Sequence, residues 1–170
     1  MEFTKVVEER YSCKSYDGRK VDRATLEKIL EAGRLAPTAR NQQEYHIYVL
    51  ESDEALAKVD LVSPCRYNAG VCLLVTYDKN NVYTYPGSTN NSGAEDATIV
   101  ATHLMLAATN EGVDNCWLNC IDIAKAHEEF NLPANEEIVM ILDLGYRSEG
   151  TGPLANHASR KPLTEKVTYM

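Results

Sequence analysis

Two patterns of apolar and polar residues alternate along the chain, and each predicts one kind of secondary structure. Between Asp22 and Pro37 the apolar side chains recur every three or four residues. This spacing predicts a helix that Asp22 caps and Pro37 ends. Residues 70–78, GVCLLVTYD, form instead a continuous apolar run of strand length. A run without polar alternation is typical of a strand that is covered on both faces.

The remaining elements follow the same two patterns and are separated by a loop at 80–93, which is rich in Asn, Gly, Ser and Pro. We expect further helices at 3–10, 52–59, 94–110 and 123–130, and further strands at 45–51 and 136–146. Helices therefore alternate with about four strands, which predicts the α+β or α/β class. The 170 residues show no internal repeat and are expected to form one domain with a polar tail.

The longest predicted helix, residues 94–110, is apolar on nearly every side. Val100 and Leu104 mark one face, while Ile99 and Leu106 are apolar and lie off that face. A helix that is apolar all round is buried on all sides. Because one chain of this size does not cover such a helix completely, we expect part of it to face a second subunit.

The charge balance excludes several kinds of partner. The chain has 17 basic and 25 acidic residues, a net charge of −8, and no run rich in Lys or Arg. This disfavours nucleic acids and anionic membrane surfaces as partners. No apolar run approaches the roughly 20 residues that span a bilayer, and the charged N-terminus lacks a signal-peptide core. We therefore expect a soluble, cytoplasmic protein.

The five cysteines are odd in number and irregular in spacing, which predicts reduced thiols rather than disulfides. Cys116 and Cys120 lack a second ligand pair, so no metal site is expected. The four histidines do not lie at triad or metal-ligand spacings from Cys, Ser or carboxylates, and no P-loop, GxGxxG or HExxH motif occurs. If the protein is an enzyme, a bound cofactor is expected to carry the chemistry.

A polar segment near the N-terminus, ERYSCKSYDG at 9–18, is a candidate anion site. In an extended segment, Arg10, Ser12 and Lys14 point to one side and present a guanidinium, a hydroxyl and an ammonium together. That set suits a phosphate monoester, and Arg160 and Lys161 of the tail are placed to complete it. The alternative interpretation is a group of solvated polar side chains after a helix.

A second polar segment, LAPTARNQQEYH at 35–46, contains Thr38, Asn41 and Gln43 on a loop that leads into a strand. Amides both donate and accept hydrogen bonds, so they can recognise the edge of a heterocycle. Ordinary turn chemistry favours the same residue types and remains the alternative.

Taken in order, these segments resemble the nitroreductase family of FMN-dependent oxidoreductases, over roughly residues 4–165. RYSCKSYDG resembles the family's R-R-S-x-R-x-F, APTARNQQEYH resembles A-P-S-x-x-N-x-Q-P-W, and GVDNCWLN is similar to a G-L-G-x-x-W-like strand. ANEEIVMILDLGY resembles the last core strand, and SRKPL the phosphate-contacting tail. The resemblance implies three FMN-binding groups: Arg10, Tyr11, Ser12 and Lys14 with Arg160 and Lys161 at the phosphate and ribityl chain; Pro37, Thr38, Asn41 and Gln43 at the flavin of the other subunit; and Trp117, Leu118 and Asn119 near the isoalloxazine ring.

The resemblance also implies a fold and an activity. The fold is a three-layer α/β/α arrangement of the α+β class with a mostly antiparallel sheet, in an intertwined homodimer whose tail, residues 150–170, packs on the partner. The activity is hydride transfer from NADH or NADPH through FMN to a nitroaromatic, quinone or similar acceptor, by a ping-pong mechanism. No catalytic side chain is required, because the flavin carries the chemistry.

Several positions depart from the family pattern. Tyr11 and Lys14 replace more usual residues, Glu44 and Tyr45 stand where Pro-Trp is usual, and Arg147 stands where Pro is frequent. The short 79–93 connection implies a more open acceptor pocket than in larger members. These departures leave open a flavin-binding, storage or sensing protein with little reductase activity, or a related reaction that cleaves or desaturates a substrate.

Overall fold

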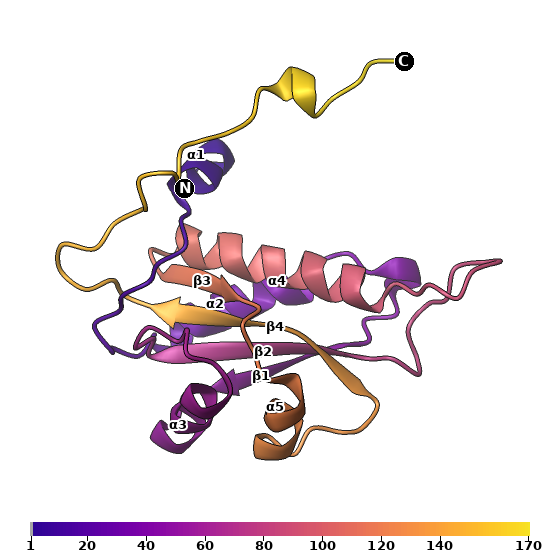
Figure 1. Cartoon of the computed structure of the whole chain (residues 1–170), viewed down its shortest axis with the longest axis horizontal. Helices are drawn as coiled ribbons and strands as arrows, with labels where there is room; N and C mark the ends of the chain where they lie inside the picture. Colours follow the sequence, from indigo (N-terminus) through magenta and orange to yellow (C-terminus); the bar gives the residue numbers. More distant parts are fainter. Residues whose placement is uncertain (1) are drawn as a thin grey trace.

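The computed structural model describes residues 2–170 and is built around one antiparallel sheet (Figure 1). Its strands are β1 (Tyr45–Leu50), β2 (Val71–Asp78), β3 (Asp114–Leu118) and β4 (Glu136–Gly145), and their order across the sheet is β1-β2-β4-β3. All three strand pairs are antiparallel, and the β2–β4 register shifts between Val75 and Thr76, where Val139 of β4 has no partner on β2. The two strongest apolar runs therefore pair with each other at the centre of the sheet.

Helices cover both faces of the sheet (Figure 1). On one face lie α2 (Arg23–Arg34) and α4 (Gly93–Asn110), and on the other lie α3 (Asp53–Val62) and α5 (Ile123–Glu129). A short helix, α1 (Phe3–Glu9), stands beyond the end of α4, and two 3-10 turns occupy Ala39–Asn41 and Leu163–Glu165. This arrangement confirms the predicted α+β class with α/β/α layers.

The central strand β2 shows why its sequence is apolar without alternation. Its side chains from Val71 to Tyr77 are all buried. Leu73 and Val75 belong to the core beneath α2 and α4, while Cys72 and Leu74 belong to the core beneath α3 and α5. Successive side chains of a strand point to opposite faces, so a strand between two helical layers is apolar at every position.

Side-chain caps begin three of the helices, and Asp22 does so as predicted. Asp22 accepts a hydrogen bond from the backbone N–H of Thr25 at 3.0 Å, and Ser52 and Asp122 cap α3 and α5 in the same way. Helix α3 continues to Val62, three residues beyond the predicted end, because Val59 and Val62 pack into the core. None of the helices in residues 2–170 combines the length and the apolar composition that crossing a membrane requires.

Helix α4 is buried on the sheet side only. Val100 and Leu104 are fully buried, and a side chain at Gly33 of α2 would come within 2.6 Å of Leu104, so α2 and α4 pack at close range. On the outer face, Ile99 is 37% exposed and Leu106 is half-buried. One copy of the chain thus leaves an apolar face of α4 uncovered, and its covering by a second subunit stays a prediction.

The tail leaves the sheet after Gly145, passes α1 and projects beyond the body of the molecule (Figure 1). Both chain ends carry exposed apolar side chains: Phe3 and Val7 on α1 are 69% and 49% exposed, and Leu154 and Leu163 in the tail are 55% and 69% exposed. These side chains are not packed against a core in a single chain. The polar, aperiodic sequence of the tail predicts the same difficulty of packing it within its own domain.

Candidate functional site

The N-terminal segment runs in extended conformation beside β3. Ser12 forms a parallel bridge with Asn115, and the backbone N–H of Cys13 donates to the Asn115 carbonyl at 2.9 Å. Tyr11 and Cys13 are buried, whereas Ser12 is half-buried and Lys14 is exposed. The alternation expected of an extended segment is therefore present, and it directs the Ser12 hydroxyl and the Lys14 ammonium away from the core.

Ser12 and Lys14 line a cleft of about 260 Å³ with Trp117 of β3. The other lining residues are Tyr11, Cys116, Leu154, Asn156 and His157. We call this the Lys14 cleft. Residues from the two segments expected to hold the phosphate end and the ring end of one cofactor thus meet in one cavity. Beside it, Leu118 is buried, and Asn119 is exposed and accepts a hydrogen bond from the Trp117 indole N–H.

A larger cleft of about 720 Å³, the Arg10 cleft, opens between α1, the end of α4 and the start of the tail. Tyr11 and His157 line both clefts and contact each other edge to face, with ring centroids 6.3 Å apart. Burial raises the pKa of Tyr11 to about 12, so this side chain is a neutral phenol in the wall between the clefts. Arg10 therefore lies next to the Lys14 cleft rather than inside it.

The basic residues of the proposed phosphate site lack acidic partners. Ten of the 17 Lys and Arg residues lie within 4.0 Å of a carboxylate oxygen. Within residues 2–170, Arg10, Lys14, Arg160 and Lys161 are among the seven that do not. In a chain of net charge −8, their charge is available to an external anion.

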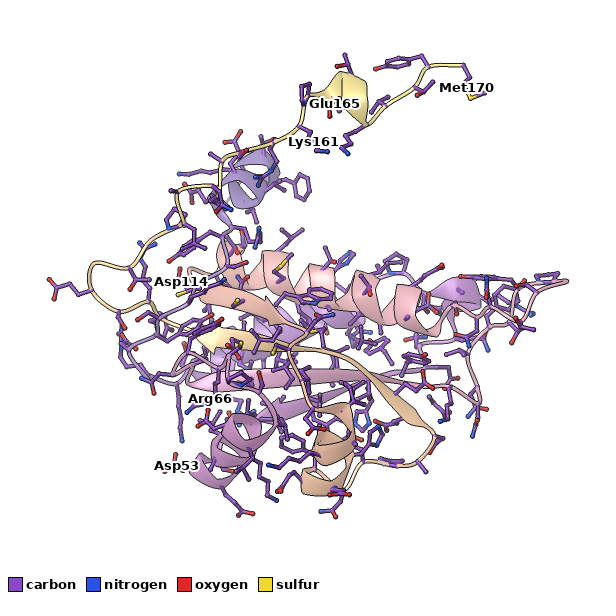
Figure 2. All side chains as sticks on the ribbon, viewed as in Figure 1. Asp53, Arg66, Asp114, Lys161, Glu165 and Met170 are labelled. Atoms are coloured by element: carbon purple, nitrogen blue, oxygen red, sulfur yellow. The ribbon has the colours of Figure 1, made fainter. Side chains whose placement is uncertain are left out.

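Neither tail cation lines the Lys14 cleft in a single chain. Lys161 lies above α1, well outside the body of the molecule (Figure 2). Arg160 donates hydrogen bonds to the carbonyls of His157 and Ser159. The tail contributes Asn156 and His157 to the cleft instead. Sequence reasoning missed these two residues, since nothing local marks which part of an aperiodic tail turns inward.

The loop that carries Pro37, Thr38, Asn41 and Gln43 lies at the opposite end of α4. The backbone N–H of Ala39 donates to Asp96 Oδ1, in the first turn of α4, at 2.8 Å. Thr109, in the last turn of α4, binds Asn115 of β3 and lines the Arg10 cleft. Thr109 lies thirteen residues after Asp96 in the helix, a rise of about 20 Å along the axis. The loop and the Lys14 cleft do not meet within one copy.

The loop itself is held in an unusual backbone conformation. Arg40, Asn41 and Gln43 have φ values of 54°, 56° and 59°. This left-handed region is uncommon for residues other than glycine and clusters at functional sites. Two contacts stabilise it: the Thr38 hydroxyl accepts the Gln43 backbone N–H at 3.1 Å, and Asp96, which is 8% exposed, fixes Ala39. No local sequence pattern marks the role of Asp96.

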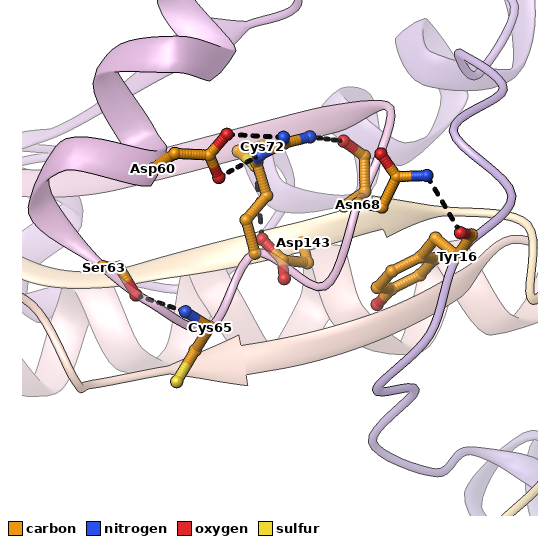
Figure 3. Close-up of polar contacts among 9 residues, drawn as sticks. Tyr16, Asp60, Ser63, Cys65, Asn68, Cys72 and Asp143 are labelled. Carbon is orange, nitrogen blue, oxygen red and sulfur yellow. Dashed lines mark hydrogen bonds and ion pairs between the residues drawn. The ribbon is translucent and has the colours of Figure 1, made fainter.

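Below the Lys14 cleft, three buried polar residues form a row across the sheet. Cys72, Asp143 and Cys116 are directly paired on β2, β4 and β3, so their side chains share one face. The Cys72 thiol donates to Asp143 Oδ1 at 3.2 Å, beside the Asp60–Arg66 ion pair (Figure 3). Burial raises the pKa of Asp143 to about 8 and that of Cys116 to about 11. Cys116 is therefore a protonated, weakly nucleophilic thiol at neutral pH.

The nitroreductase family model matches residues 7–66 and 63–146 of this chain. The chain therefore belongs to the nitroreductase family, which confirms the resemblance read from its motifs. The matched residues include the N-terminal segment, the Thr38 loop and the sheet, and they end before the tail.

Individual proteins agree with this assignment. A protein of Archaeoglobus fulgidus provisionally named NADH dehydrogenase/NAD(P)H nitroreductase is 28% identical over 153 residues, 85% of each chain. A nitroreductase family protein of Clostridium difficile 630, solved as a crystal structure, is 36% identical with a TM-score of 0.93 over 99% of this chain and 98% of its own. A protein of Exiguobacterium sibiricum provisionally named nitroreductase, solved in complex with FMN, shares the fold at a TM-score of 0.87 and 19% identity, covering 100% of this chain and 98% of its own.

Proposed function

We propose that this protein is an FMN-dependent oxidoreductase that passes a hydride from NADH or NADPH through FMN to an electron-poor acceptor such as a nitroaromatic or a quinone. The observation that carries the proposal is the Lys14 cleft, where Ser12 and Lys14 lie together with Trp117. The pair expected to bind the phosphate and an aromatic residue from a different part of the chain share one cavity.

The donor set of the cleft fits FMN. The phosphate monoester is an anion, and the side chains offered to it are the Lys14 ammonium, the Ser12 hydroxyl and the neighbouring Arg10 guanidinium, none with a carboxylate partner among residues 2–170. Each charge-assisted hydrogen bond contributes about 1.5–3 kcal/mol. The Tyr11 side chain, a neutral phenol, lines the cleft beside these three groups.

FMN, when bound, supplies the ring that accepts and passes on the hydride. The protein binds the phosphate, orients the ring and limits the access of water. Near the ring we expect Trp117, Leu118 and Asn119, whose backbone N–H groups would stabilise negative charge. The buried thiol of Cys116 is neutral and is not assigned a chemical role.

The separation of the two binding groups along α4 supports a homodimer with FMN at the interface. A second copy packed antiparallel on the open face of α4, which carries Ile99 and Leu106, would bring its Thr38 loop to the Lys14 cleft of the first. Pro37, Asn41 and Gln43 would then reach the flavin of the other subunit. The exposed apolar residues of α1 and of the tail at 150–170 suit the same partner, and Arg160 and Lys161 are proposed to reach a phosphate in that assembly.

One experiment tests the proposal directly. The purified protein, loaded with FMN and freed of oxygen, is mixed with NADH or NADPH in a stopped-flow instrument, and the flavin absorbance is followed. Bleaching by either donor, and recovery of the colour when a nitroaromatic or quinone is added, are expected. A yellow protein that neither donor bleaches would instead support flavin storage or sensing, the alternative that Glu44 and Tyr45 in place of Pro-Trp motivate. A cytoplasmic location stays a prediction from the sequence.

A further inference from the structure

Two loops at the N-terminal end of α4 form one structural unit, which we call the Arg40–Tyr83 unit and define as residues 38–43 and 81–92. The Gln42 side-chain amide donates to the Asn81 carbonyl at 3.0 Å. Asp96 accepts the Ala39 N–H through one oxygen and the Ser92 hydroxyl through the other, at 2.8 and 2.7 Å. The buried carboxylate of Asp96 therefore holds both loops to α4. A ligand that contacts one loop would lie next to the other.

The unit presents two aromatic rings and a cation. The Arg40 guanidinium carbon lies 5.4 Å from the centroid of the Tyr83 ring. The rings of Tyr83 and Tyr85 pack edge to face, 5.7 Å between centroids and at 79°. Tyr83 and Tyr85 are only partly buried and Arg40 is exposed. Large aromatic side chains held in fixed geometry at a surface are typical of binding sites.

Arg40 retains its charge for a ligand. No carboxylate of residues 2–170 lies within ion-pair distance of it. The carboxylates that face the unit from α4 are engaged elsewhere, since Asp96 accepts the two bonds above and Glu95 accepts the hydroxyl of Tyr85. The φ of 54° at Arg40 shows that the backbone is held in an uncommon conformation at this position.

We propose that the Arg40–Tyr83 unit recognises the acceptor, and that the acceptor is a flat, electron-poor aromatic ring that carries an anionic substituent. The ring packs on Tyr83 and Tyr85, and a carboxylate on it pairs with the planar donor fork of Arg40. This inference rests on the proposed function, because it places the Thr38 loop of one copy against the flavin held in the Lys14 cleft of the other.

A binding experiment on the oxidised FMN-loaded protein tests the inference without turnover. The flavin absorbance is titrated with 4-nitrobenzoate and with the uncharged 4-nitrobenzamide, in the absence of a nicotinamide donor. We expect Arg40→Ala to weaken binding of the carboxylate about tenfold, the value of one charge-assisted contact, and to leave the amide within about twofold. Arg40→Lys should restore part of the difference, because it keeps the charge and loses the fork.

Matched variants separate the ring from the charge. Tyr83→Leu is expected to weaken both ligands, because both lose the aromatic surface, and Tyr83→Phe should bind both as the wild type does. Arg23→Ala is the control for arginine loss, since Arg23 is paired with Glu51 and lies at the far end of α2 from the Thr38 loop. FMN content is measured for every variant, so that loss of the cofactor is not mistaken for weaker binding of the acceptor.

The outcomes distinguish this inference from the proposed function. A wild-type protein that does not bind FMN, or that neither donor bleaches, overturns the proposed function itself. If the wild type is bleached but Arg40→Ala affects both nitro compounds equally or neither, the assignment of Arg40 to the acceptor is wrong. If Arg40→Ala slows bleaching by NADPH but not by NADH, and 4-nitrobenzoate binds unchanged, the cation serves the extra phosphate of the donor and the assignment is likewise overturned.

Discussion

The Cys72 thiol on β2 donates a hydrogen bond to Oδ1 of Asp143 on β4, at 3.2 Å. Asp143 has no exposed surface, and its other oxygen, Oδ2, has no partner in residues 2–170. A carboxylate in this environment is costly in its charged form, so burial raises the pKa of Asp143 from 3.8 to about 8.

The raised pKa of Asp143 predicts that the protein loses stability as the pH rises. The folded state holds the proton more tightly than the unfolded state, so the contribution is complete below about pH 4 and is lost as the pH rises toward 8. The slope is at most about 1.4 kcal/mol per pH unit. Asp143→Asn should remove this dependence, and urea unfolding at pH 5, 6.5 and 8 measures it. Asp53→Asn, at a side chain that is 97% exposed, is the control and should keep the wild-type slope.

The lowered pKa of Glu136 predicts the opposite dependence of stability on pH. Burial alone would raise its pKa, but hydrogen bonds from Thr76, His46 and Tyr48, at 2.6, 3.0 and 2.8 Å, together lower it. Its contribution to stability is therefore present above about pH 4.5 and is lost as the pH falls through the lower folded pKa. Glu136→Gln should cost about 2 kcal/mol of unfolding free energy at pH 7 and less at pH 3.

The control for Glu136 is Glu128→Gln, an exposed position on α5. Equal losses in the two variants, or a loss at Glu136 that does not shrink at low pH, would contradict the hydrogen-bonded carboxylate.

The phosphate assignment predicts a loss that depends on the phosphate itself. Lys14→Ala and Arg10→Ala should each weaken FMN binding about 10- to 100-fold, since each removes one charge-assisted contact, and should leave riboflavin affinity nearly unchanged. Flavin fluorescence quenching measures both affinities. Lys125→Ala is the matched control, because Lys125 also lacks a carboxylate partner within residues 2–170 but lies on α5, on the other face of the sheet.

Arg160→Ala extends this test to the assembly. Arg160 lies outside the lining of the Lys14 cleft in one chain, so a selective loss of FMN over riboflavin in this variant would show that the tail reaches a phosphate in the dimer. If FMN affinity is unchanged in Lys14→Ala, Arg10→Ala and Arg160→Ala, the assignment of these residues to the phosphate is wrong.

The open face of α4 predicts the oligomeric state. A charge at Ile99 would be buried in the interface, so Ile99→Glu should shift the protein in sedimentation velocity from twice 19.0 kDa to 19.0 kDa and should release FMN. Ile123→Glu is the matched control, because Ile123 is similarly exposed on α5 at the opposite face. A wild-type protein that sediments only at 19.0 kDa at micromolar concentration would rule out the shared site.

Local patterns in the sequence predict the helices and strands of the fold, and they assign the candidate site residues to particular segments. Asp22 and Asp122 mark helix starts in the sequence because a cap acts on the next three residues. The apolar run at 70–78 predicts the central strand, since burial on both faces leaves no polar position. Ser12 and Lys14 could be placed on one side of the chain because alternation in an extended segment is local.

Which of these segments meet depends on contacts between residues that are distant in sequence. The pairing of Ser12 with Asn115 brings Lys14 to Trp117, and the length of α4 keeps the Thr38 loop about 20 Å away from both. The buried acids Asp96, Glu136 and Asp143 gained their roles from neighbours distant in sequence. Hydrogen bonding and burial of this kind are sums over long-range contacts, and no local pattern records them.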